Sequence, residues 1–487
     1  MKPSFLFAVV YVLALLLPAS ESLAQKRGMG LKMDDARYLR LPRKSPNIVF
    51  KGVLPASFSL RSLMPEIGDQ GMDGTCVGWS AAYYMRTVME AGKQGLTGQP
   101  ARITATAFSP GWLYGQIRSG QDNGCADGVY LEDALEVMKT KGSAFLSCAP
   151  GNCTVRYDQC DDKATNYKIA DYATLFSPGD SSFTAAQRIH AIKSALVESK
   201  SAVLTGMLVP PSFIDATGEN WQPAPGESAA NAIGGHSLAI IGYDDHVNEG
   251  SFLIANSWGT AWGSGGYIWA KYGDLARFIK NAYQIYTEPP ARPQPQTIAM
   301  QGDIDFLTGS GAMAVHSTVS KGAQVTMGQP KTEMLTYTMS QPHASGTRFK
   351  MVISNSRQSY VYILGSDKEN RVSALFPDNS EEMITSAVVP ANSQMLMPSP
   401  HSSFTLDDMT GEDYFIVFIS QNELNLEELA ARIKNADGTI VQKAFSALGE
   451  EFISPKAISY APGKISYEVK GAPKGSVVPV LVKIIHQ

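Results

Sequence analysis

One cysteine of this chain stands where a nucleophile could be activated. Cys76 follows Gly74 and opens a run whose apolar residues recur at the spacing of a helix. The positive end of a helix dipole favours the thiolate, which is the reactive form of cysteine. Near neutral pH such a thiol also needs a base within reach and a group that orients the base. A lone cysteine at the start of an apolar helix is more often a core residue, so its interpretation depends on those two partners.

A histidine and an asparagine offer the missing groups. His236 follows Gly234 and Gly235 at the start of an apolar, strand-like run. Asn256 comes directly after a second such run, which ends at Ala255. If the two strands are neighbours, the imidazole and the amide lie side by side. The sequence therefore predicts a nucleophile, a base and an orienting group at Cys76, His236 and Asn256.

The elements that must position these residues are helices first and strands later. This order is typical of an α+β domain made of two packed lobes. The first helix should run from Cys76 to a stop at Ala91-Gly92. The patterns predict further helices over 130–141 and 185–198, and strands over 202–209, 237–243, 251–255 and 266–271.

The second half of the chain is of a different kind. Residues 288–297 are rich in proline and predict a stiff linker. Residues 298–487 then form a mostly β, sandwich-like domain with one helix, capped by Asn425. Its predicted strands cover 348–354, 360–365, 372–376, 414–419 and 478–485. The runs 360–364 and 375–378 resemble an uncharacterised β-rich domain appended to bacterial envelope enzymes, which implies a scaffold or adaptor and a possible protein partner.

The first residues predict export. Lys2, an apolar stretch too short to span a bilayer comfortably, and small residues ending at Ala24 are typical of a signal peptide over 1–24. An uncleaved anchor is the alternative. No later run is long and apolar enough to cross a membrane, so the mature chain is expected in the periplasm or secreted. Residues 25–54 are polar and basic without a sustained period, which predicts an N-terminal arm or a short pro-segment.

Composition excludes several classes of function. With 487 residues, the chain is long enough for two or three domains. A net charge of −4 with scattered basic residues excludes a nucleic-acid surface. The chain has no zinc-ligand spacing, no phosphate-binding glycine loop and no Gly-x-Ser-x-Gly elbow. No metal or cofactor is expected.

Export changes how the five cysteines are interpreted. In an oxidising compartment an even subset can form disulfides and an odd one remains. Cys125, Cys148, Cys153 and Cys160 lie close together and could form two disulfides, in three possible pairings. Cys76 is then the thiol left over.

Three motifs in order carry a resemblance to a known family. The segment from Gln70 to Cys76, the Gly-His-Ser strand at His236, and the Asn-Ser-Trp-Gly stretch at Asn256 resemble the papain-like cysteine peptidases, family C1. The resemblance covers about residues 55–287. It implies a two-lobed fold, with a helical lobe and a β-barrel-like lobe, and cleavage of peptide or protein substrates.

The resemblance also implies a role for each matched residue. Cys76 would be the nucleophile, and His236 the general base and then the acid toward the leaving amine. Asn256 would orient the imidazole, and Trp258 would shield their hydrogen bond from water. Gln70 would donate to the oxyanion hole together with the backbone N–H of Cys76.

Substrate would lie across the cleft between the lobes, against Asp127, Gly128, Gly235 and Trp258. The family usually has glycine where this chain has Asp127, so the cleft could be narrower or favour a basic substrate residue.

Other positions depart from the family pattern. Asp73 stands in place of a cysteine, and Val77 in place of a tryptophan, with Trp79 two residues on. The long inhibitory pro-helix of many members is also missing, so residues 25–54 offer only a short substitute.

The leading hypothesis is an exported cysteine endopeptidase that acts through a thioester on Cys76. The alternative is a catalytically idle papain fold that binds peptides in an envelope or secretion assembly. A peptidoglycan-cleaving cysteine hydrolase is a third possibility, disfavoured because its usual third residue is not an asparagine followed by Ser-Trp-Gly.

Overall fold

The structure is a computed structural model of the chain. It describes residues 27–38, 44, 48–50, 53–150, 155–176, 184–286, 298–321, 333–367, 369, 371–377, 385–398, 403–471 and 473–487. The predicted signal peptide and the predicted proline-rich linker lie outside the described residues. No helix within these ranges is both long and apolar enough to cross a membrane.

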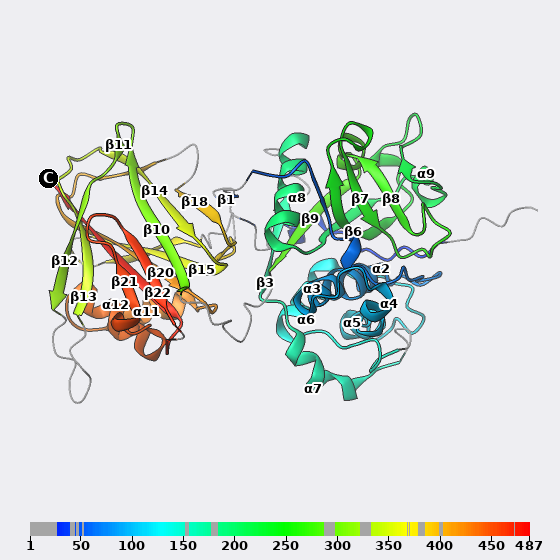
Figure 1. The fold of residues 1–487 in the computed structure, drawn as a ribbon, viewed down its shortest axis with the longest axis horizontal. Coiled ribbons are helices and arrows are strands. Elements are labelled where there is room, and N and C mark those ends of the chain that lie inside the picture. Colours follow the sequence, from blue (N-terminus) through cyan, green and yellow to red (C-terminus); the bar gives the residue numbers. More distant parts are fainter. Residues whose placement is uncertain are drawn as a thin grey trace, which may run out of the picture.

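The first part of the chain combines a helical layer with an eight-stranded sheet (Figure 1). The strand order is β3-β9-β4-β6-β7-β8-β5, with β2 paired to β6. The strands are β2 (Ser57–Ser59), β3 (Asp171–Phe176), β4 (Val203–Leu208), β5 (Asn220–Trp221), β6 (Gly235–Asp244), β7 (Ser251–Ala255), β8 (Tyr267–Lys271) and β9 (Ile279–Tyr286). The helices are α2 (Cys76–Gly78), α3 (Thr87–Gln94), α4 (Pro100–Ala105), α5 (Pro110–Ile117), α6 (Leu131–Thr140), α7 (Asp161–Ala164), α8 (Ala185–Ser199), α9 (Pro211–Ile214) and α10 (Tyr272–Ala276).

The helix that begins at Cys76 is continuous over three segments. Between α2 and α3, the segment η2 (Trp79–Arg86) has the wider bonding of a π-helix. Such segments occur frequently at functional sites. The helix ends at Gly95, whose φ of 68° closes it in a left-handed turn, a few residues beyond the expected stop. At its start, Gly78 packs against the backbone of Pro110, where a Cβ would lie 2.4 Å from the carbonyl oxygen.

The second part is a sandwich of two sheets, as predicted. One sheet has the order β1-β18-β14-β10-β22-β21, in which β1 is Ile48–Phe50, and the other β12-β13-β23-β20-β15-β16. Apolar side chains of both sheets, such as Ile353 and Val417, form a common core. The strands are β10 (Ile298–Thr308), β11 (Gly311–Ala312), β12 (Val315–Lys321), β13 (Glu333–Met339), β14 (Arg348–Asn355), β15 (Ser359–Ser366), β16 (Val372–Phe376), β17 (Val388–Val389), β18 (Ser393–Met397), β19 (Phe404–Thr405), β20 (Gly411–Ser420), β21 (Ile458–Tyr460), β22 (Ser466–Lys470) and β23 (Val477–His486).

Two helices pack on the outer face of the second sheet. The predicted helix is α11 (Leu426–Asn435), and the Asn425 side chain accepts the N–H of Glu428 at its start. A second helix, α12 (Ile440–Leu448), is capped by Thr439 and was not expected from the sequence. Leu429 of α11 and Ile440 of α12 are buried in one apolar cluster on this face.

The same apolar cluster reaches the first part of the chain. Ala173 and Tyr286, from β3 and β9, pack in it with Tyr360 of β15. The Tyr360 hydroxyl donates to the carbonyl oxygen of Ala170, 3.3 Å away. Close by, Lys139 forms ion pairs with Asp171 and Glu423. The two parts therefore meet over a mixed apolar and charged contact beside β3.

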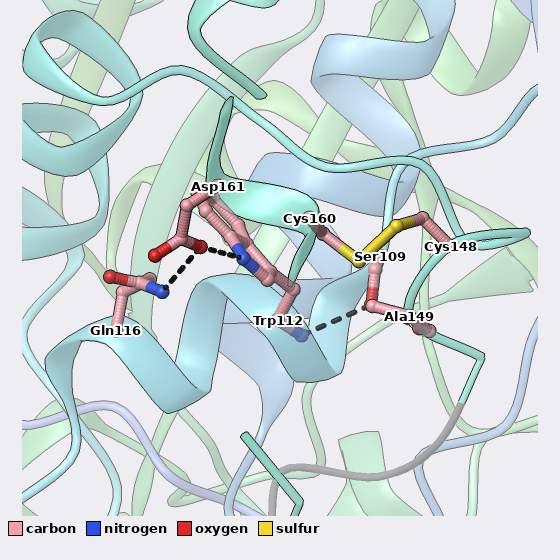
Figure 2. Close-up of a disulfide and its surroundings, with 7 residues drawn as sticks. All are labelled: Ser109, Trp112, Gln116, Cys148, Ala149, Cys160 and Asp161. Atoms are coloured by element: carbon pink, nitrogen blue, oxygen red, sulfur yellow. Dashed lines mark hydrogen bonds between the residues drawn. A yellow bond between two sulfur atoms is a disulfide. The ribbon is translucent and has the colours of Figure 1, made fainter. Parts of the chain in front are cut away.

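A disulfide joins Cys148 and Cys160 beside helix α5 (Figure 2). Next to it, Ser109 caps α5 by accepting the Trp112 N–H and donates its own proton to the carbonyl of Ala149. Cys125 is also disulfide-bonded, and Cys153 lies outside the described residues. Cys76 is the one free cysteine in the described part of the chain, as predicted.

Candidate active site

Cys76 and His236 come from the two layers and meet where α2 packs on β6. The N–H of Ser237, the residue after the histidine, donates to the Cys76 sulfur at 3.5 Å. The Ser237 hydroxyl in turn bonds that of Ser80, one turn along the helix, at 2.6 Å. These contacts fix the start of the helix against the strand that carries the imidazole.

His236 and Asn256 lie side by side, because β6 and β7 are antiparallel neighbours. The Nε2 atom of His236 lies 2.8 Å from the Oδ1 atom of Asn256. That oxygen also accepts the N–H of Ser257, which fixes the orientation of the amide. Since Oδ1 can only accept, Nε2 carries the ring proton. The lone pair is therefore on Nδ1, which is buried and has no hydrogen-bond partner among the described residues.

Trp258 covers this pair. Its ring stacks on the imidazole with 4.3 Å between centroids and 25° between planes. The tryptophan is itself buried, and its edge meets Phe213 and Trp262. Water is thus kept from the hydrogen bond between His236 and Asn256.

Burial keeps both reactive groups neutral. Desolvation raises the pKa of the Cys76 thiol to about 11, although the nearby backbone N–H groups of Ser237 and Gly30 lower it. Desolvation also lowers the pKa of His236 to about 4, against the opposing effect of the Asn256 hydrogen bond. Near pH 7 this site holds a thiol and a neutral imidazole.

The site is covered by residues 28–32 of the chain's own N-terminal arm, which we define as the described residues between 27 and 50. The N–H of Leu31 donates to the carbonyl of Gly235, and the N–H of Lys32 to that of Val129. The N–H of Val129 donates back to Gly30. Cys76 and His236 are consequently 0% exposed.

The arm packs closely on the peptidase because glycines at the contact leave no room for a side chain. A Cβ on Gly128 would lie 2.3 Å from the Gly30 oxygen, and one on Gly235 would lie 2.5 Å from the Leu31 oxygen. Two predicted substrate-binding residues, Gly128 and Gly235, therefore contact the arm, and we call the surface that residues 28–32 cover the groove. Asp127 is exposed beside it.

Gln70 also meets the arm. Its Nε2 group donates to the carbonyl oxygens of Gly28 and Asp73, and its Oε1 atom accepts the Ser257 hydroxyl. The indole N–H of Trp258 donates to the same Gly28 oxygen at 3.0 Å. Two buried donors thus converge on one carbonyl oxygen of the arm.

The sequence predicted an N-terminal arm or a short pro-segment, but not its position over Cys76 and His236. The only local signal was the pair Gly28 and Gly30, two residues apart in an otherwise polar and basic segment. A Cβ on Gly28 would lie 2.1 Å from the oxygen of Asp73. The need for glycine there comes from residues that are distant in sequence.

The covered thiol should react slowly with iodoacetamide. Raising its pKa from 9.0 to about 11 lowers the thiolate fraction by about 100-fold at a fixed pH below both values. We expect the alkylation rate of Cys76 in the full chain, followed by mass spectrometry, to rise tenfold per pH unit up to pH 10. Urea-unfolded protein provides the reference rate. A plateau near neutral pH would show that the thiolate already exists in the covered chain.

The cysteine, the histidine and the asparagine predicted from the sequence thus lie together where a helical layer meets a sheet. Residues 54–289 match the family model described as papain family cysteine protease. Residues 342–423 match a domain of unknown function (DUF4384).

Individual relatives agree with the family match. A cysteine protease of Blomia tropicalis is 24% identical over 249 residues, which cover 49% of this chain and 67% of that protein. A gut-specific cysteine proteinase of Caenorhabditis elegans is 26% identical over 282 residues, covering 52% and 81%. Among solved structures, xylellain, a cysteine protease from Xylella fastidiosa, aligns at 21% identity with a TM-score of 0.41, covering 54% of this chain and 97% of that one.

Residues 54–289 are thus a papain family cysteine protease domain, and a separate C-terminal β-rich domain follows it.

Proposed function

We propose that the protein is an exported endopeptidase that hydrolyses peptide bonds through a thioester on Cys76. The observation that carries this proposal is the state of the His236 ring, whose Nε2–H is held by Asn256 while the Nδ1 lone pair is free. Nδ1 takes the thiol proton as the sulfur attacks the substrate carbonyl carbon. The C–N bond then breaks, and His236 returns the proton to the leaving amine. Water, deprotonated by the same nitrogen, hydrolyses the thioester.

Gln70 and the backbone N–H of Cys76 are proposed to bind the oxyanion. A donor for an oxyanion must be buried, fixed and aimed at the position of the oxygen. Gln70 is 5% exposed, its amide is fixed by the Ser257 hydroxyl, and Nε2 already donates to a carbonyl oxygen of the arm. The indole N–H of Trp258 donates to that same oxygen, which also supports the proposal.

Residues 25–54 are proposed to act as a short pro-segment. The arm fills the groove with backbone hydrogen bonds that a substrate would need. It presents the N–H of Gly30 to the Cys76 sulfur, whereas attack requires a carbonyl carbon at that position. The arm therefore occupies the site without being a substrate in this arrangement.

Export is proposed from the signal-like first residues, and disulfides support it. Cys148 and Cys160 are bonded, and such bonds persist in oxidising compartments such as the periplasm or the extracellular space. We propose domain limits of 55–287 for the peptidase and 298–487 for the β-rich domain, joined by the linker 288–297.

A direct test is digestion of an unbiased peptide library by the chain freed of its arm. Cleavage of internal peptide bonds, and labelling of Cys76 by a thiol-directed epoxide, are the expected results. A chain that neither takes up the epoxide nor cleaves any library member would refute the proposal. The alternative, an idle papain fold that binds peptides, has no direct support in the site, and it would tolerate Cys76→Ser with peptide binding unchanged.

Replacing Asn256 with alanine should lower kcat by about 100-fold and leave KM nearly unchanged. Without Oδ1 the imidazole loses its partner at Nε2, so the fraction of rings with Nδ1 directed at the thiol falls. The measurement is steady-state kinetics on the arm-free chain. Ser264→Ala, on the loop before β8, is the control and should keep both parameters. An unchanged kcat in Asn256→Ala would exclude an orienting role.

A further inference from the structure

The arm does not end at the groove but continues to the C-terminal domain. Its helix α1 (Asp35–Tyr38) packs on the peptidase, with Tyr38 fully buried and Arg37 paired with Asp133. Further on, the N–H of Lys44 donates to the carbonyl of Thr174, and its ammonium group pairs with Glu198. Residues 35–38 and Lys44 of the arm are thus both held on the peptidase.

The arm then adds a strand to the C-terminal domain. Strand β1 (Ile48–Phe50) pairs antiparallel with β18, with Ile48 opposite Met395 and Phe50 opposite Ser393. Within the described sheet, β18 lies between β14 and β1 (Figure 1). Without β1 it would be the edge of this sheet, and an open edge offers a row of unpaired N–H and C=O groups to an extended peptide.

The position of β18 is fixed relative to the groove. The Ser386 hydroxyl donates to Asp171 of the peptidase at 3.0 Å, and the chain continues from there through β17 into β18. The N–H of Asn392, just before β18, donates to the carbonyl of Asn355 in β14. The segment that contacts the peptidase at Ser386 therefore leads directly into β18, the strand that pairs with the arm.

After β1 the chain returns to the peptidase, where Ser57–Ser59 form β2 on β6. Residues 53–56, which precede β2, are accessible, since Val53 is 95% exposed. A cut in this stretch would separate the arm covalently from the enzyme. The pairing with β18 and the contacts in the groove would still hold it, and two linked contacts bind much more tightly than either one alone.

We propose that β18 is a docking edge for an extended peptide segment and that it retains the arm in the groove, so that the C-terminal domain controls the opening of the peptidase. This inference rests on the proposed function of the arm. The partner of this edge is an extended segment that pairs antiparallel with residues 393–395. Residues 48–50 of the chain itself supply that segment. A competing strand at this edge would favour release of a cut arm.

The test uses the full chain with a specific protease site placed over residues 53–56. Ile48→Pro/Val49→Pro removes backbone N–H groups from the pairing, and Ile48→Thr/Val49→Thr is the matched control that keeps them. After cutting, the arm should dissociate about tenfold faster from the proline variant, measured by size-exclusion chromatography and mass spectrometry. A synthetic peptide of residues 44–54 in excess should speed arm release in the threonine control and have no effect in the proline variant.

Equal arm release from the two variants would overturn the docking role of β18. A second variant, with residues 48–50 replaced by Gly-Ser-Gly, should behave as the proline variant does, and thermal unfolding of each uncut chain checks that both domains are folded. Retention of the arm is measured without any substrate, so it does not depend on catalysis. The isolated, arm-free chain is assayed in parallel, and its failure to cleave peptides would count against the proposed function alone.

Discussion

Replacing Cys76 with alanine should abolish peptide-bond hydrolysis by the arm-free chain. Removing the nucleophile of a comparable hydrolytic site lowers kcat by on the order of 10⁶-fold, so the remaining rate should be close to the background. The alanine lacks the sulfur that accepts the Ser237 N–H and that forms the proposed thioester. Cleavage of a fluorogenic peptide and labelling by the epoxide should disappear together.

The control for this substitution lies on the same helix. Met89→Leu changes a buried side chain at similar volume, so activity and labelling should persist. Both variants should melt within a few degrees of the parent, because a Cys-to-Ala change removes one atom from the core. If Cys76→Ala still cleaves peptides at a rate near that of the parent, the nucleophile is another group and the proposed mechanism is wrong.

The sequence allowed the central elements of the site to be predicted because their signals are local. Two glycines before His236, and an apolar strand before Asn256, mark the ends of neighbouring strands. The helix at Cys76 was visible from its apolar spacing, although its π-type segment was not, because that bonding depends on how the helix packs. Helix α12 was missed despite the capping signal at Thr439.

The conformation of the predicted arm could not be derived from the sequence, because it is set by distant residues. Residues 27–33 have no period of their own, and they are ordered by bonds to Gly71, Val129 and Gly235. The pairing of β1 with β18 joins residues far apart in sequence, and a three-residue strand leaves almost no local pattern. The same contacts decide whether the thiol is accessible. The sequence therefore indicated which residues form the site, but not that the arm covers them.

Deleting the arm should activate the peptidase by roughly 10³-fold. Four backbone hydrogen bonds join residues 28–32 to Gly71, Val129 and Gly235. Each contributes about 1 kcal/mol net to the binding of the arm, and burying Leu31 adds roughly 2 kcal/mol. Part of this gain is offset by the entropy of ordering the arm. A net value of about 4 kcal/mol corresponds to roughly 10³-fold competition with substrate. The expected result is a rise of that size in the rate of epoxide labelling and of peptide cleavage.

A point substitution separates release of the arm from loss of the segment. In Gly30→Ala the new Cβ would lie 1.8 Å from the Gly74 oxygen, which is backbone and cannot rotate away. This full-length variant should therefore label and cleave at rates close to those of the deletion. Lys32→Ala, which keeps the backbone N–H that bonds Val129, should stay as inactive as the parent. If Gly30→Ala stays inactive while the deletion is active, the groove accommodates a bulkier arm than this geometry allows. If the deletion is inactive too but still takes up the epoxide, covering by the arm is not what holds catalysis back.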